Sequence, residues 1–223
     1  MCGLYSFRKG AEETRNLFNY REMADCPPRQ YVAPGGPIAI VRMDQGVRSF
    51  ALVRWGFVPG WAKEVKPGKP LINARGETVA EKPSFRNAFR RRRCLIPVDG
   101  FYEWLGDVPG RKIPYFIHRP DDGLFAFAGL WEHWMDADGS ELETGVIITT
   151  TPNREVAEIH DRMPVVVEPG DYETWLTGDS ADAQALIHPI RDGYFAVEPT
   201  RIARTPPPPK QAPAEKPGQM KLI

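Results

Sequence analysis

Long apolar runs are missing from this sequence. None of its 223 residues lies in an apolar stretch long enough, at about 18 residues, for a membrane-spanning helix. The N-terminus also lacks the basic segment followed by an apolar core that marks a secretory signal. We therefore expect a cytoplasmic protein with no membrane partner.

Cysteine and histidine are scarce. The three cysteines, Cys2, Cys26 and Cys94, are odd in number and show no CxxC spacing, so they fit neither a disulfide framework nor a metal site. The four histidines form neither an HExxH motif nor a spacing of two histidines and one carboxylate. We expect free thiols in a reducing compartment, no metal and no cofactor.

Net charge is also absent, because 29 lysines and arginines balance 29 acidic residues. Without a global basic field, any nucleic-acid surface must be a local patch. The length suits one large domain. From about Arg204 the chain becomes proline-rich and cannot bury a core. We therefore expect a domain over residues 1–203 and a tail without fixed structure over residues 204–223.

Short runs rich in Val, Ile, Phe and Trp, punctuated by proline and glycine, predict strands along most of the chain. These runs are 31–43, 49–61, 94–104, 114–119, 124–134, 145–150, 163–167 and 194–197. The Asp138-Gly139 pair predicts a hairpin turn. Short helices are predicted at residues 11–23, 83–93, 151–160, 169–178 and 182–188. The pattern indicates an α+β fold, a single mainly β domain with flanking short helices.

The Met1-Cys2-Gly3 start raises a chemical possibility. If Met1 is removed, Cys2 carries a thiol and a free α-amine on adjacent carbons, and such an aminothiol can condense with an aldehyde to form a thiazolidine. With pKa values of about 8 for the amine and about 8.5 for the thiol, each group is reactive in a minor fraction at pH 7. The reaction therefore needs a nearby carboxylate or imidazole. A cysteine at position 2 is, however, more often incidental.

Glu103 is a candidate for that carboxylate. It lies between bulky aromatic residues, and the strand period of two places it on the same face as Phe101 and Leu105. This favours an inward carboxylate with a raised pKa, which can donate and accept protons. The alternative is a solvated strand residue.

Asn73 and Arg75 are two residues apart on a short extended segment and therefore face the same side. Asn73 can orient a carbonyl or hydroxyl group, and Arg75 can hold a phosphate or carboxylate. The local sequence favours a different interpretation, in which Asn73 caps a turn and Arg75 pairs with Glu77.

His160 is the candidate imidazole. The predicted helix 151–160 has Pro152 at its first position and ends at His160, beside Asp161 and Arg162. A histidine there can act as a general acid or base, because its pKa lies near the working pH. It can also simply cap helix carbonyls.

Arginine and aromatic residues could together form a platform for single-stranded nucleic acid. The candidates are Arg86, the run 90–93, Arg75, Trp55 and Trp61. Guanidinium groups would meet phosphates while bases stack on rings. The alternative is a solvated helix face with tryptophans in the core.

Six motifs occur in order along the chain. They are MCG at the start, VAPG at 32–35, WGFVPGWAK at 55–63, INARGET at 72–78, RRCLIPVDGFYEW at 92–104 and IHDRMPV at 159–165. Together they resemble the SRAP family, the SOS-response-associated peptidases or abasic-site processing proteins, over nearly all of the first 200 residues. The resemblance implies the SRAP fold, with a barrel-like mixed sheet.

The resemblance implies an enzyme that crosslinks to the open-chain aldehyde of an abasic site in single-stranded DNA. Cys2 would form the thiazolidine after autocatalytic removal of Met1, the peptidase activity of the family name. Asn73 would hydrogen-bond the opened sugar, and Glu103 would carry protons during thiazolidine formation and reversal. His160 would assist ring opening or strand-cleaving β-elimination, an AP-lyase activity.

The family pattern also implies residues that contact DNA. Arg75 and Arg162 match positions that hold phosphates, Thr149 matches a further phosphate contact, and Trp61 matches a ring packed at the lesion. Pro34, in the VAPG motif, belongs to the same implied surface. The implied partner is single-stranded DNA containing abasic sites, and we expect a monomer that associates with the nucleoid when bound.

Three positions depart from the family pattern. Leu4 stands where many members have an arginine, which removes a phosphate contact. Tyr31 replaces an asparagine before VAPG, which removes a polar group near the site. Ala62 follows Trp61 where some relatives carry a second tryptophan.

Two other functions remain open. An N-terminal nucleophile amidohydrolase of the glutamine amidotransferase kind also begins with Met-Cys-Gly, and would use the Cys2 thiolate against an amide. A non-catalytic module that only binds single-stranded DNA would leave Cys2 inert. The downstream motifs do not match the amidotransferases.

Overall fold

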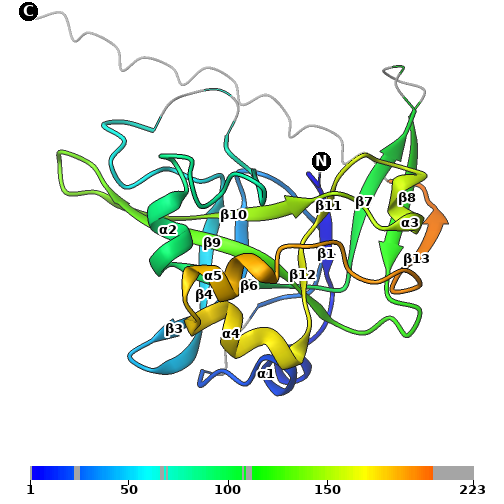
Figure 1. Cartoon of the computed structure of the whole chain (residues 1–223), viewed down its shortest axis with the longest axis horizontal. Coiled ribbons are helices and arrows are strands. Elements are labelled where there is room, and N and C mark those ends of the chain that lie inside the picture. The colour runs from blue at the N-terminus through cyan, green and yellow to red at the C-terminus, as the bar shows by residue number, and fades with distance from the viewer. Residues whose placement is uncertain are drawn as a thin grey trace, which may run out of the picture.

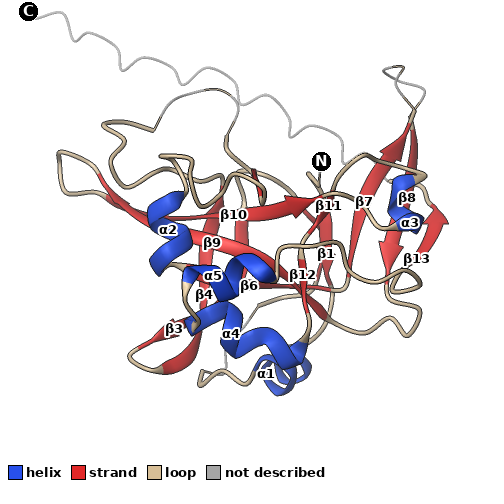
Figure 2. Cartoon of the chain, in the orientation of Figure 1, coloured by secondary structure: helices blue, strands red, loops and turns tan. Residues whose placement is uncertain are grey.

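The structure is a computed structural model that describes residues 2–22, 26–65, 68, 70–106, 108 and 112–202. The proline-rich segment 204–223 lies outside the described residues. Strands make up the interior, and the helices are short and lie around them (Figure 2). None of the described helices has the length and apolar character needed to cross a membrane.

Five strands close into a barrel, which confirms the predicted mainly β fold with a barrel-like mixed sheet. Pairing runs in the order β10-β4-β3-β6-β9, and β9 pairs with β10 to complete the ring. Only β4 and β10 run parallel within it. The barrel strands are β3 (Pro37–Asp44), β4 (Val47–Trp55), β6 (Arg93–Val98), β9 (Phe125–Met135) and β10 (Glu141–Thr150).

Turn residues of the expected kinds join the barrel hairpins. Gln45 and Gly46 both have positive φ, 47° and 81°, as the two-residue turn between β3 and β4 requires. Between β9 and β10, Gly139 has φ 88° and Asp136 N donates to Ser140 O at 2.8 Å. The predicted hairpin at Asp138-Gly139 is therefore confirmed.

A second, five-stranded sheet lies on one side of the barrel (Figure 1). Its order is β13-β8-β7-β1-β2, with all pairs antiparallel. Its strands are β1 (Tyr5–Phe7), β2 (Arg29–Val32), β7 (Gly100–Leu105), β8 (Ile113–His118) and β13 (Ala196–Pro199). Since β1 begins three residues after Cys2, this sheet determines where Cys2 lies.

Asp99 fixes β1 at the junction between the two sheets, because it separates β6 from β7. Its carboxylate is fully buried and accepts from the Ser6 hydroxyl at 2.5 Å, the Arg8 main-chain N–H and Arg8 Nε at 2.9 Å. Asp99 N also donates to Ser6 O at 3.1 Å. A buried carboxylate with this many donors is satisfied and holds the N-terminal strand in place.

The remaining elements are short. The helices are α1 (Ala11–Phe18), α2 (Arg86–Arg91), α3 (Arg154–Ala157), α4 (Tyr172–Thr177), α5 (Ser180–Ala185) and the 3-10 turn η1 (Pro169–Asp171). The remaining strands are β5 (Asn73–Arg75), β11 (Met163–Pro164) and β12 (Val166–Val167). In Figure 1, α2, α4 and α5 lie on the side of the barrel away from β8 and β13.

All five α-helices are shorter than predicted, and capping residues account for the difference in two of them. The first ends at Phe18, because Asn19 adopts a left-handed conformation (φ 50°) and closes the last turn with its N–H on Arg15 O. The second, α3, spans only residues 154–157. Asn153 is its N-cap, accepting from Val156 N at 3.2 Å, so Pro152 precedes the cap and His160 lies beyond the helix.

Two of the predicted nucleic-acid residues belong to the core instead. Trp55 is fully buried and donates from its indole to Ile72 O at 2.9 Å. Arg93 is also buried and donates to the main-chain carbonyls of Phe89, Trp175 and Gly178. Arg93 therefore satisfies carbonyls near the ends of α2 and α4, as buried polar groups must be satisfied.

Candidate active site

Cys2 lies in the interior beside β7. Its side chain is fully buried, and Tyr102 N donates to Leu4 O at 2.9 Å, which aligns residues 2–4 with that strand. The thiol lies 3.9 Å from Leu4 O. Burial, and then the nearby Glu103 carboxylate, raise the pKa of the Cys2 thiol well above its usual range. In this arrangement the thiol is protonated at neutral pH.

Asn73 connects the barrel to Cys2. Strand β5 pairs in parallel with β10, with Asn73 opposite Ile147. The Asn73 Nδ2 group donates to Cys2 O at 2.9 Å. Its Oδ1 atom is buried and has no hydrogen-bond partner among the described residues. Asn73 therefore does not cap a turn, and it presents one unused acceptor at Cys2.

Glu103 points inward, as the strand period predicted. Only 2% of the residue is exposed. Burial raises the pKa of Glu103 to about 6, against the opposing effect of the positively charged amino terminus. Tyr102, on the other face of β7, is also buried, because it packs on Phe116 with ring centroids 4.9 Å apart. A carboxyl group with this pKa can change protonation state near neutral pH.

His160 lies in the loop that follows α3. Arg162 N donates to His160 Nδ1 at 3.0 Å, and Asp161 Oδ1 lies 2.8 Å from the same nitrogen. Burial lowers the pKa of His160, which favours the neutral ring. The Asp161 carboxylate also contributes to the raised pKa of Glu103. Asp161 is therefore close enough to Glu103 to affect its pKa.

The predicted DNA-contact residues fall into two groups. Pro34, Arg75 and Trp61 are exposed, whereas Thr149 is fully buried. Arg162 is mostly covered as well, because its side chain is bound to Thr149 and to Glu77. The exposed residues are therefore accessible to a ligand, whereas Thr149 and Arg162 form hydrogen bonds within the protein.

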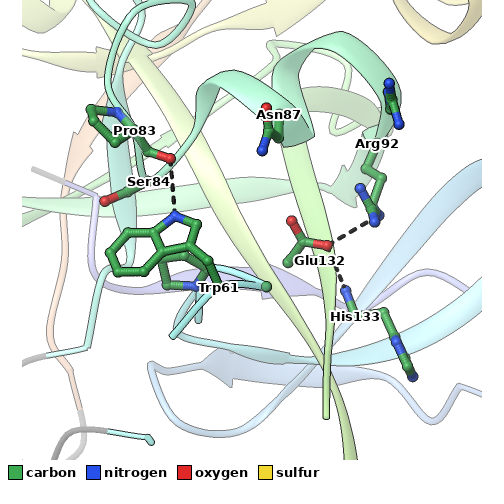
Figure 3. Close-up of a pocket in the computed structure, with 10 residues that line it drawn as sticks. Trp61, Pro83, Ser84, Asn87, Arg92, Glu132 and His133 are labelled. Carbon is green, nitrogen blue, oxygen red and sulfur yellow. Dashed lines mark hydrogen bonds and ion pairs between the residues drawn. The ribbon is translucent and has the colours of Figure 1, made fainter. Parts of the chain in front are cut away.

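Trp61 lines a hollow of about 440 Å³ at the surface. Figure 3 shows its indole nitrogen directed at Pro83 O, a hydrogen bond of 3.2 Å, with the Arg92 and Glu132 pair beside it. Asn87 and Arg91 complete the polar side of the lining. The hollow does not include Cys2, which is fully buried.

The partner predicted for Glu77 from local spacing, Arg75, is wrong. We predicted an alternative pairing with Arg75, but Glu77 binds Arg162 through two hydrogen bonds of 2.6 and 2.9 Å. These residues are 85 positions apart, so no local pattern could have identified the pair. The pairing of β10 with both β5 and β11 brings their segments together.

Tyr31, one of the three departures from the family pattern, packs on the face of β7 opposite Glu103. Its ring centroid lies 5.5 Å from that of Tyr102, the residue that precedes Glu103. Leu4 contributes its carbonyl to the main-chain contact with Tyr102. Among the described residues, no group of three or more His, Cys, Asp or Glu side chains is arranged to hold a metal ion.

Sequence comparison identifies relatives of this chain among known proteins. The family model of the SOS response associated peptidase (SRAP) matches residues 1–202. The abasic site processing protein YoqW of Bacillus subtilis is 40% identical over 213 residues, covering 92% of this chain and 95% of the relative. The abasic site processing protein HMCES of Gallus gallus is 32% identical over 243 residues, covering 87% and 72%.

Solved structures show the same fold. A crystal structure of a protein from Bacteroides thetaiotaomicron superimposes with a TM-score of 0.79 and 25% identity, covering 90% of this chain and 92% of that one. A second, from Bordetella bronchiseptica, gives a TM-score of 0.78 at 26% identity. From the ordered motifs, the barrel and the match over residues 1–202, this chain belongs to the SOS response associated peptidase (SRAP) family.

Proposed function

We propose that this protein processes abasic sites in single-stranded DNA by forming a covalent crosslink through Cys2. The observation that carries the proposal is the meeting of Asn73 and Glu103 at Cys2. Asn73 Nδ2 donates to the Cys2 carbonyl. The negative charge of the nearby Glu103 carboxylate raises the pKa of the Cys2 thiol. The relatives named as abasic site processing proteins support the same substrate.

The chemistry requires that Met1 be removed first. Water is added across the Met1-Cys2 peptide bond, methionine leaves, and the α-amine of Cys2 becomes free. We propose that the protein performs this hydrolysis itself. An intact-mass measurement of purified protein will show the loss of one methionine residue, and retention of Met1 in active protein would contradict this step.

Crosslinking then proceeds by condensation. The Cys2 amine adds to the aldehyde carbon of the opened sugar, and the resulting carbinolamine loses water to give a C=N bond. The thiol gives up its proton and its sulfur bonds to the same carbon, which closes the thiazolidine. One aldehyde and one aminothiol therefore yield one ring and one water molecule.

Asn73 and Glu103 have different parts in this scheme. The free Asn73 Oδ1 acceptor can receive a hydrogen bond from a hydroxyl group of the opened sugar. Glu103, with a pKa of about 6, can accept the proton of the amine or thiol and return one to the departing oxygen.

The test is a denaturing gel of the processed protein with a single-stranded oligonucleotide carrying one abasic site. A heat-stable shifted band, absent with undamaged DNA, is the expected result. Reversible binding without a band would favour the non-catalytic module instead. Glutaminase activity without a band would favour the amidohydrolase.

His160→Ala is expected to slow crosslink reversal and strand scission, with crosslink formation retained. Burial favours the neutral His160 ring, which can accept a proton, and loss of a general acid or base costs about 10²-fold or more. The rates of strand scission and of crosslink release on a labelled abasic oligonucleotide measure this. Unchanged scission would remove His160 from the mechanism.

Trp61→Ala is expected to weaken binding of single-stranded DNA without changing the stability of the protein. The ring is 62% exposed, so little packing is lost, while stacking of one base is worth about 1–3 kcal/mol. Fluorescence anisotropy with an undamaged oligonucleotide measures the loss, which we expect to be about tenfold. Trp55→Phe is the control in the core, where the effect should be on stability alone.

A further inference from the structure

Arg162 is held inside the protein by acceptors on two other segments. Its Nη1 donates to Glu77 Oε1 at 2.6 Å, and its Nη2 donates to Glu77 Oε2 at 2.9 Å and to Thr149 O at 2.7 Å. Only 14% of the Arg162 side chain is exposed. A bidentate guanidinium and carboxylate pair fixes both distance and plane. Residue 162 is therefore fixed relative to β5 and β10.

The segment that carries Glu77 is built to approach Thr149 closely. Gly76 N donates to Thr149 O at 2.8 Å, the same oxygen that accepts from Arg162. A Cβ atom at residue 76 would lie 2.2 Å from Ile187 Cγ2, so a larger residue would force the segments apart. Glycine at this position therefore allows the segment before Glu77 to pack closely against Ile187 and Thr149.

The main chain of Arg162 in turn contacts His160. Arg162 N donates to His160 Nδ1 at 3.0 Å, and the Asp161 carboxylate lies 2.8 Å from the same atom. One ring nitrogen cannot serve both partners at once. A neutral ring with its hydrogen on Nε2 accepts from Arg162 N, whereas a ring with a hydrogen on Nδ1 donates to Asp161. The position of Arg162 N therefore favours the Nε2–H tautomer, and the Asp161 carboxylate favours the Nδ1–H tautomer.

We propose that Glu77 is a positioning residue for His160, acting through Arg162. The carboxylate holds the guanidinium, the guanidinium holds the 160–162 loop, and the loop fixes the orientation and tautomer of the imidazole. The proposed effect on catalysis rests on the proposed function of His160. A further consequence is that a DNA phosphate must displace Glu77 before it can bind Arg162.

The direct test is the tautomer of His160 in the absence of DNA. Protein labelled with ¹⁵N in histidine is compared by NMR as wild type, Glu77→Gln and Glu168→Gln. Glu168 is a matched control, because it also pairs with an arginine, Arg191, at 2.5 Å and is 43% exposed compared with 47% for Glu77. We expect the Nε2–H signal to shift toward the Nδ1–H form in Glu77→Gln alone.

The kinetic test uses single-turnover rates on an abasic oligonucleotide. Glu77→Gln is expected to slow the His160-dependent scission about tenfold, since small misplacements of a reacting group have effects of this size. Crosslink formation should be unchanged, and DNA binding should be no weaker. In a His160→Ala background, Glu77→Gln should cause no further loss.

Several results would overturn the proposal. These are a His160 signal that is unchanged in Glu77→Gln, an equal slowing of crosslinking and scission, or a tenfold effect that persists without His160. The proposed function fails separately, if the wild-type protein makes no crosslink, and the role of His160 fails if His160→Ala cleaves normally. The tautomer measurement decides the positioning role in either case.

Discussion

Cys2→Ser is expected to abolish the heat-stable crosslink. A serine hydroxyl with an adjacent amine still allows a C=N bond to form, but the hydroxyl is a much weaker nucleophile than a thiol and does not close the ring effectively. The imine is reversible and is hydrolysed when the protein is denatured. We therefore expect a loss of at least about 10²-fold in crosslinked product on a denaturing gel.

Borohydride gives this experiment a second readout. It reduces an imine to a stable amine, so Cys2→Ser should yield a band with reductant and none without it. Cys94→Ser is the matched control, because Cys94 is also fully buried and its thiol pKa is likewise raised by burial. A wild-type level of crosslink in Cys2→Ser, or its loss in Cys94→Ser, would contradict the assignment of Cys2.

Glu103→Gln is expected to slow crosslinking about 10²-fold while single-stranded DNA still binds. Gln keeps the shape of the side chain but cannot take up a proton. In the wild type, the crosslinking rate should rise as the pH increases through about 6, because Glu103 then becomes a proton acceptor. Single-turnover rates between pH 5 and 8 should show this rise in the crosslinking rate in the wild type and not in Glu103→Gln. Equal rates for the two proteins would remove the role.

The same substitution is expected to stabilise the fold. The pKa of Glu103 is raised in the folded protein from 4.5 to about 6, so the folded state favours the protonated carboxyl. The contribution of the protonated Glu103 carboxyl to the free energy of unfolding is present at pH below 4.5 and is lost as the pH rises through about 6. At pH 7 the buried carboxylate therefore costs about 2 kcal/mol, which Gln avoids.

Thermal unfolding at pH 7 and at pH 4 tests this sign. Glu103→Gln should melt at a higher temperature than the wild type at pH 7, and the difference should largely vanish at pH 4. Glu132→Gln is the control, because Glu132 is also buried but pairs with Arg92 at 3.1 Å. Removal of a carboxylate from an ion pair should lower stability. A destabilised Glu103→Gln at pH 7 would contradict the cost assigned to this carboxylate.

Features that depend on local sequence pattern could be predicted before the structure was known. Alternation along residues 100–105 predicted that Glu103 points inward, and the Asp138-Gly139 pair predicted its hairpin, because strand period and turn conformation are local properties. The ordered motifs were sufficient to predict the family and a mainly β barrel-like fold. The proposed aminothiol at Cys2, which requires removal of Met1, is suggested by the position of this cysteine alone.

Contacts between side chains that are far apart in the sequence depend on the tertiary fold. Asn73 is bound to Cys2 across 71 positions and Glu77 to Arg162 across 85, while Trp55 and Arg93 are drawn into the core. Such contacts depend on the pairing of β5 with β10 and of β1 with β7, which spacing along the chain does not encode. Residue types thus determined the available chemistry, and the strand pairing determined which groups surround Cys2.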